Sequence, residues 1–223
     1  MLPYIIIHHT EQTFEMALFI NHTIFDQRIE DKRLASKLLI PLLDDILKKN
    51  NLTITDISFF GINQGPGLFS TLRSIIATIN ALHFSTRIPI IGVDGLTATA
   101  LEFNNSTYPF TVTLLNAYNN DVHYAICQNK QTISMGYQNI STFLKTLLNK
   151  SSTAKFYFIG NAVSIYQDCI KSKYGSRAII PIPIPQLCSI NTIASLALKK
   201  FIHNTQEQTY LFPLHLKKHP VEL

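Results

Sequence analysis

The stretch that most constrains the fold is residues 57–84, which combine a short apolar run, a glycine turn and a longer apolar-periodic segment. Residues 57–62 favour a strand, and residues 64–67 (Gln-Gly-Pro-Gly) supply the turn. Apolar side chains then recur at helical spacing as far as residue 82. A second apolar run follows at residues 87–93, so this part of the chain predicts a βαβ unit with parallel strands.

The other face of the predicted helix is made of small side chains, with only Arg73 and His83 able to carry charge. A helix that is apolar on one side and small on the other has almost no solvated face. Such a helix is either buried on both sides or free to pack closely against a partner helix. The small residues are Ser70, Ser74, Ala77, Thr78 and Ala81.

A second predicted helix, over residues 34–47, carries a broad leucine stripe with Pro41 inside it. An interior proline costs about 3 kcal/mol of helix stability unless a kink or a late start accommodates it. Two interpretations of the stripe stay open. Either all of its leucines face the sheet, or Leu34, Leu38 and Leu42 partly face another molecule.

The remaining pattern predicts two lobes, residues 1–103 with 190–223 and residues 104–189. Strands are expected at 4–7, 13–20, 110–117, 122–128 and 155–159, with a turn at His8-His9-Thr10. Further helices are expected at 94–103, 142–148, 162–171 and 191–203.

Composition adds that the protein is globular and lightly charged, with 46% hydrophobic and 15% charged residues. A surface short of charge suggests that another chain covers part of it. The net charge of +5 comes from scattered lysines and arginines, which is a weak signal for direct nucleic-acid binding. Three separated cysteines, no signal peptide and no run of 18 apolar residues predict a cytoplasmic protein with reduced thiols and no membrane segment.

The motifs for catalysis are incomplete. The glycine turn matches neither G-x-x-x-x-G-K-[ST] nor G-x-G-x-x-G, and Pro66 removes one backbone donor from it. His8 and His9 point to opposite faces of an extended chain and cannot share a metal ion there. His215 and His219 have the spacing of two metal ligands on a helix, but prolines flank them, so they are interpreted as surface histidines.

Residues 65–73 (GPGLFSTLR), followed by residues 88–93 (IPIIGV), resemble the TsaB (YeaZ) family, which has G-P-G-S-F-T-G-L-R and then I-P, two hydrophobic residues and G-V. The resemblance extends over nearly the whole chain. It includes the leucine-proline helix, a pair of strands similar to D-A-R-x-x-E-V-Y, a G-D-G-A-like turn and a closing P-x-Y-L-R-like segment. These last three are Asn116-Ala117-Tyr118 with Asp121-Val122-His123, then Gly160-Asn161-Ala162, then Pro213-Leu214-His215-Leu216-Lys217.

This resemblance implies an α/β, two-lobed actin-like ATPase (ASKHA) fold with a degenerate nucleotide site. It also implies a non-catalytic scaffold subunit in the synthesis of tRNA threonylcarbamoyladenosine at position 37, paired with the catalytic paralogue TsaD and joined by the ATPase TsaE. A homodimer is expected when the chain is alone, and contact with tRNA is expected to be indirect. No cofactor is expected on this chain alone, and ATP or ADP at the interface of the complex stays open.

The expected site residues divide into two groups. Departures from the family pattern predict no catalytic and no metal-binding residue, because His8-His9 replaces an opening Asp-Thr, and Gly95 and Thr99 stand where the catalytic paralogue has its two metal histidines. The glycine loop is Gly65, Pro66 and Gly67, with Leu68 and Thr71 departing from the pattern. The expected partner interface is Leu34, Leu38, Leu42, Ser70, Arg73, Ser74, Ala77 and Ala81.

Two other functions compete with the scaffold. One is an enzyme in its own right, either a glycoprotease-like metallopeptidase or a small-molecule kinase of the same fold. Both would need a metal or ATP site whose ligand set is not complete in this sequence. The other is a homodimeric interaction module that uses the same helices.

Overall fold

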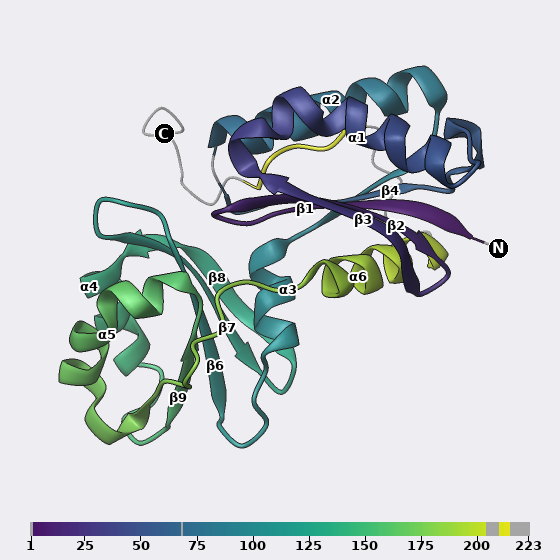
Figure 1. Cartoon of the computed structure of the whole chain (residues 1–223). Coiled ribbons are helices and arrows are strands. Elements are labelled where there is room, and N and C mark those ends of the chain that lie inside the picture. Colours follow the sequence, from purple (N-terminus) through teal and green to yellow (C-terminus); the bar gives the residue numbers. More distant parts are fainter. Residues whose placement is uncertain (1, 68, 204–209, 215–223) are drawn as a thin grey trace. The chain divides into compact units, whose positions relative to one another are not determined.

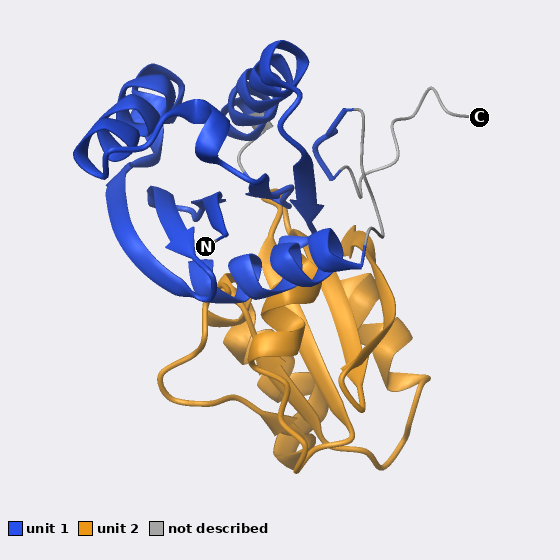
Figure 2. Ribbon diagram, turned by 90° about the vertical axis from the view of Figure 1, so that its right-hand side faces the viewer, with its two compact units in different colours: residues 1–95, 189–214 blue, residues 96–188, 215–223 orange. Residues whose placement is uncertain are grey.

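The computed structural model describes residues 2–67, 69–203 and 210–214. These residues form two compact units, coloured separately in Figure 2. Unit 1 takes residues 1–95 and 189–214 within those limits, and unit 2 takes residues 96–188. Residues 96–103, which the sequence analysis places in the first lobe, thus cluster with unit 2.

Unit 1 is built on a mixed five-stranded sheet in the order β3-β2-β1-β4-β5. The first three strands are antiparallel, whereas β1, β4 and β5 run parallel to one another, as the predicted βαβ unit requires. Its strands are β1 (Pro3–His9), β2 (Thr13–Ile20), β3 (Thr23–Asp31), β4 (Phe60–Asn63) and β5 (Ile90–Val93). Its helices are α1 (Ala35–Lys49), α2 (Phe69–Thr86) and α6 (Ile190–Ile202).

Helices cover both faces of this sheet (Figure 1). Alternate residues of the strands, such as Ile5 and Ile7, pack with α1 and α2 in one apolar core. The residues between them face α6: a Cβ at Gly61 would collide with Ala197, and Phe59 stacks on Phe201 with ring centroids 4.6 Å apart. Since α6 takes one face, α1 and α2 share the other and lie side by side on it.

Unit 2 repeats this plan with a second five-stranded sheet, in the order β10-β9-β6-β7-β8. Helices α4 and α5 pack on one face of it, and α3 contributes Leu96 and Ala100 to a smaller cluster with Ala125 and Cys127 of β7. Its strands are β6 (Phe110–Asn116), β7 (Asp121–Gln128), β8 (Gln131–Asn139), β9 (Phe156–Ile159) and β10 (Ala178–Ile179). Its helices are α3 (Gly95–Glu102), which begins at the last residue of unit 1, α4 (Ile140–Leu148) and α5 (Asn161–Tyr174).

The predicted elements are confirmed to within a few residues, but three strands and one turn differ. The edge strands β3 and β8 and the two-residue edge strand β10 are absent from the prediction, and His8 and His9 lie in β1 instead of a turn. Strands β3 and β8 are half-exposed and mix apolar with polar residues, so they lack the continuous apolar runs of the central strands. In the described part of the chain, every helix is too short or too polar to span a bilayer.

Candidate functional site

The outer surface of α2 is a stripe of exposed and mostly small residues. Residues at helical spacing on the inner side, such as Leu72, Ile75 and Ile79, are buried against the sheet. The opposite side is exposed at each turn of the helix, and Ser74 beside it is half-buried. The exposed residues, called the α2 stripe below, are Ser70, Arg73, Ala77, Ala81 and Phe84.

The leucine stripe of α1 divides between the core and the surface. Leu39, Leu43, Ile46 and Leu47 are buried, whereas Leu34 is 40% exposed. Leu38 and Leu42 are half-buried, and Leu42 packs at the margin of the core. The interpretation that all the leucines face the sheet is therefore wrong for Leu34, which is exposed, whereas contact of Leu34, Leu38 and Leu42 with another molecule stays a prediction.

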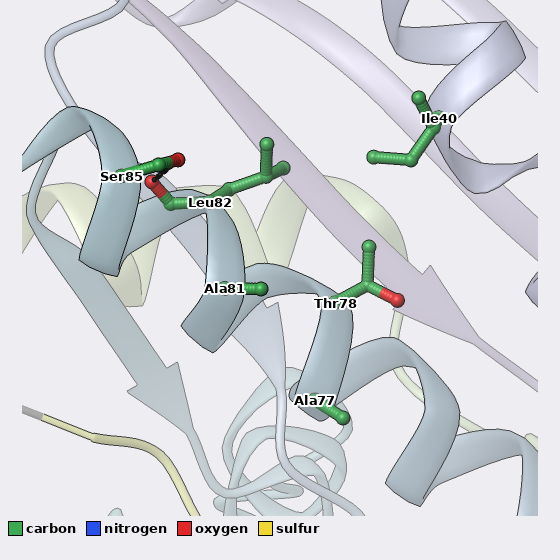
Figure 3. Close-up of a pocket in the computed structure, with 6 residues that line it drawn as sticks. All are labelled: Ile40, Ala77, Thr78, Ala81, Leu82 and Ser85. Atoms are coloured by element: carbon green, nitrogen blue, oxygen red, sulfur yellow. Dashed lines mark hydrogen bonds between the residues drawn. The ribbon is translucent and has the colours of Figure 1, made fainter.

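An apolar pocket lies between the two helices where Ile40 of α1 approaches the second half of α2 (Figure 3). Ile40 is 46% exposed. Only two side chains of the lining are polar, and both are already bonded within α2: the Thr78 hydroxyl donates to Ser74 O at 2.9 Å and the Ser85 hydroxyl to Leu82 O at 3.0 Å. The lining residues are Ile40, Ala77, Thr78, Ala81, Leu82 and Ser85.

This lining decides what kind of ligand the pocket suits. A small-molecule site has a few convergent polar groups that fix the orientation of the ligand. Here the two hydroxyls are used inside the helix, and the remaining surface is methyl and methylene groups. The pocket therefore suits an apolar side chain of another protein, with small residues around it that let a helix backbone come close.

Charges gather at the far end of α1. The Arg28 guanidinium contacts Asp26 and reaches Asp45 at 2.7 Å, and Lys48 bonds Asp44 at 2.7 Å. Burial acts to raise the pKa of Asp26, but hydrogen bonds from Arg28 and Asn50 outweigh it and hold that pKa below its usual value. These pairs lie on β3 and the second half of α1, whereas Arg73 is the one charged side chain of the α2 stripe.

The glycine turn lies at the carboxyl ends of the parallel strands, which is where open α/β sheets bind ligands. Here protein groups fill that edge. Asn63 at the end of β4 lies 3.1 Å (Nδ2) from Nδ1 of His8, and its Oδ1 accepts from the backbone of Gly65 at 2.9 Å. Gly65 has a φ of 107°, and a Cβ at Gly67 would collide with Cε1 of the His9 ring.

The two positions that the resemblance aligns with metal histidines are also packed. A Cβ at Gly95 would collide with the Asn63 side chain, so a histidine does not fit there. Thr99 is fully buried, and its hydroxyl accepts from the Cys188 backbone at 3.0 Å. Among the residues that the structure describes, no three His, Cys, Asp or Glu side chains are grouped so as to hold a metal ion.

The buried His9 makes the stability of the folded protein depend on pH, which the sequence did not suggest. It is 4% exposed, its Nε2 has no partner, and burial lowers its pKa to about 4 against backbone hydrogen bonds that act to raise it. The folded protein thus keeps His9 neutral, whereas the unfolded chain takes up a proton near pH 6.5. Stability from this residue is present above pH 6.5 and is lost as the pH falls towards 4.

We therefore expect acidification from pH 7 to pH 5 to reduce the free energy of unfolding by about 2 kcal/mol through His9 alone. Urea denaturation of the wild type and of His9→Gln at both pH values isolates this contribution, because other titrating groups are common to both proteins. The loss between the two pH values should be smaller in the variant by that amount. Equal losses would show that the folded protein protonates His9 as readily as the unfolded chain does.

The sequence indicated four of the five residues of the α2 stripe but missed four contributors to this surface. Ile40, Leu82 and Ser85 line the pocket, and Phe84 extends the stripe by one turn. Helical spacing from Ala77 and Ala81 was the signal available for Ser85 and Phe84. Nothing in the sequence alone showed that Ile40 approaches α2, because that contact depends on how the two helices lie on the sheet.

Comparison with known proteins now gives the family. Residues 30–214 match the family model described as "TsaD: tRNA N6-adenosine threonylcarbamoyltransferase". This chain belongs to that family. Since the match takes in most of both units, it rests on far more than one motif.

Its curated relatives include proteins named TsaB. The chain is 23% identical over 137 residues to the "tRNA threonylcarbamoyladenosine biosynthesis protein TsaB" of Buchnera aphidicola (subsp. Acyrthosiphon pisum), a match that spans 60% of this chain and 62% of the relative. It is 26% identical over 95 residues to the protein of the same name in Haemophilus influenzae, spanning 42% of this chain and 40% of the relative. These matches cover less than two thirds of either relative.

Solved structures with the same fold include a Pseudomonas aeruginosa protein described as similar to peptidase YEAZ, with a TM-score of 0.73 and 16% identity over 97% of this chain and 100% of that one. Another P. aeruginosa structure, YeaZ, has a TM-score of 0.68 with the same identity and coverage. The predicted resemblance to TsaB (YeaZ) and the predicted actin-like α/β fold are both confirmed.

Proposed function

We propose that this chain is a non-catalytic scaffold subunit in the biosynthesis of tRNA threonylcarbamoyladenosine, and that it pairs with the catalytic paralogue TsaD. Family membership and the names of its TsaB relatives support the pathway. The observation that carries the pairing is the α2 stripe, which is exposed, has Arg73 as its one charged side chain, and presents small residues and Phe84 beside the apolar pocket at Ile40.

The α2 stripe suits a helical partner because two helices can approach closely there and little hydration of polar groups is lost. Ala77 and Ala81 project little beyond the helix backbone, so a second helix can approach α2 closely and bury apolar surface from both sides. The hydroxyl groups of Thr78 and Ser85 keep a hydrogen bond when water is excluded, because each already donates to a backbone carbonyl of α2. Burying the part of this face around Ala77 and Ala81, away from the Arg73 guanidinium, therefore costs little in polar desolvation.

The proposal that the chain is not itself an enzyme rests on the packing of the strand ends. In an active member of this fold, a carboxylate near the end of β1 would manage a metal-bound phosphate, whereas here His8 and His9 occupy that place. The His9 ring and the Asn63 side chain lie against the glycine turn, where a phosphate would need backbone donors. Among the described residues at this edge, the ligand set that a metallopeptidase or a small-molecule kinase needs is incomplete.

The remaining parts of the proposal follow from the same pairing. The chain works in the cytoplasm, the ATPase TsaE joins the pair, and contact with tRNA is made by the complex. No cofactor is proposed for this chain alone, and ATP or ADP would bind at the interface of the complex. A homodimer through the same face is proposed for the chain without its partner.

Sedimentation velocity on this protein, on TsaD from the same organism and on their mixture tests the central claim. A new, heavier species at micromolar concentration is the expected result. Two unchanged boundaries would contradict the scaffold function and favour a self-associating module or a separate enzyme. ATP hydrolysis by the purified chain alone, above the level of a mock preparation, would contradict its non-catalytic role.

A further inference from the structure

A short segment near the end of the chain, Tyr210–Leu214, runs extended along unit 1 and is fixed there at several points. We call it the strap. The side chain of Asn80 in α2 both donates to the backbone oxygen of Leu211 at 3.0 Å and accepts from its backbone nitrogen at 2.9 Å. Gln64 adds two more bonds: its Nε2 donates to Phe212 O and its backbone oxygen accepts from Leu214 N, both at 2.9 Å.

The strap alternates between the core and the surface. Leu211 is 1% exposed and packs into the core shared by the sheet, α1 and α2. Its neighbours point the other way, so Tyr210 is 49% exposed and Phe212 is 73% exposed. Two aromatic rings are thus presented to solvent from a backbone whose position is set by four hydrogen bonds and a buried leucine.

The position of Asn80 on α2 places the strap next to the α2 stripe. At 100° per residue, Asn80 lies about 60° around the helix from Ala77, while Thr78 lies about 100° around in the opposite sense. Thr78 lines the pocket shared with α1, so α1 and the strap flank the stripe on opposite sides. Phe84, on the stripe one turn after Asn80, is also exposed and has Arg87 over its ring at 5.4 Å.

We infer that the strap is a third part of the partner-binding face, with Phe212 and Tyr210 as aromatic anchors that insert into apolar pockets of the TsaD paralogue. This inference rests on the proposed function, because the partner is the one that α2 receives. The strap is continuous with the α2 stripe. A partner that covers Ala77 and Ala81 therefore reaches α1 on one side and the strap on the other.

Two such rings can supply a large share of the binding free energy of an interface. Binding energy concentrates in a few rigid aromatic or arginine side chains that are fully desolvated at an interface. A ring on a flexible tail loses conformational entropy when it binds, and a ring on a fixed backbone loses much less. The four hydrogen bonds from Asn80 and Gln64 have already ordered the strap in the free protein.

The test compares Phe212→Ala and Tyr210→Ala with Phe25→Ala in titration calorimetry against purified TsaD of the same organism. Phe25 is a matched control because it is 62% exposed in β3, at the edge of the sheet away from β4 and the strap. All three side chains are exposed, so melting temperatures should stay close to that of the wild type. We expect Phe212→Ala to weaken binding at least tenfold, Tyr210→Ala to weaken it less, and Phe25→Ala to change it less than twofold.

The outcomes distinguish a failure of the inference about the strap from a failure of the proposed function. Wild-type affinity in both strap variants, with binding lost in an α2 variant such as Ala77→Glu, would overturn the inference and leave the proposed function standing. Equal weakening by Phe25→Ala and Phe212→Ala would also overturn it, because the effect would then belong to any exposed ring. If the wild type itself fails to bind TsaD, the proposed function fails and the inference with it.

Discussion

Replacing Ala77 with glutamate is expected to weaken association with TsaD by a hundredfold or more, equivalent to about 2.8 kcal/mol. Ala77 is exposed on the α2 stripe and lines the pocket below Ile40. A closely packed helix would have to bury the new carboxylate without a partner, and an unpaired buried charge is among the most costly changes at an interface. Sedimentation velocity of the mixture should show the heavier species lost at micromolar concentration.

The matched control for this variant is Ser195→Glu. Ser195 is exposed in the middle of α6, which covers the opposite face of the same sheet, so the same charge is added to the same unit away from the proposed interface. Both variants should keep the circular dichroism and melting temperature of the wild type. Undiminished binding by Ala77→Glu would show that the α2 stripe is not where the partner docks, and loss of binding in both would point to a general effect of charge.

Gly160→Ala is expected to cost unit 2 about 3 kcal/mol or more of stability. Gly160 lies between β9 and α5 with a φ of 100°, a conformation that side chains disfavour. A Cβ there would collide with the Leu114 backbone oxygen and lie 2.8 Å from its carbonyl carbon. The backbone of β6 cannot move aside without losing its pairing with β7 and β9.

Gly175→Ala separates the two causes. Gly175 also has a positive φ, of 54°, but nothing lies within 4 Å of its missing Cβ. This variant should therefore carry only the conformational cost, about 1 kcal/mol. Urea denaturation followed by the ellipticity of the whole chain and by the fluorescence of its tyrosines measures both variants. Similar losses in the two would mean that the contact with Leu114 relaxes freely.

Some elements could be predicted from local sequence because their signals are local. Strand β2 was predicted at its observed bounds, since residues 13–20 are mostly apolar and end at an Asn-His turn. The βαβ unit was predictable for the same reason, as apolar period and glycine turn are both read over a few residues. Strands β3 and β8 were missed because an edge strand has one solvated side and so shows no apolar run.

The same distinction between local and long-range signals applies to the candidate site. Helical periodicity was enough to identify the small residues of α2, and the resemblance to TsaB (YeaZ) was enough to identify the family. The split of the α1 leucines, the burial of His9 behind Gly67 and the bonding of Leu211 to Asn80 were not predictable, because each joins residues distant in the chain.

By itself, then, the sequence determined which faces of each helix are apolar, where the glycine turn lies and which family the chain resembles, since all three are written in short-range patterns. Only the tertiary structure decided which apolar residues remain exposed. That outcome depends on the packing of α1, α2 and the strap over one sheet, which buries Leu39 and Leu211 but leaves Ala77 and Phe212 in solvent. Burial is a property of the assembled layers, and no single segment encodes it.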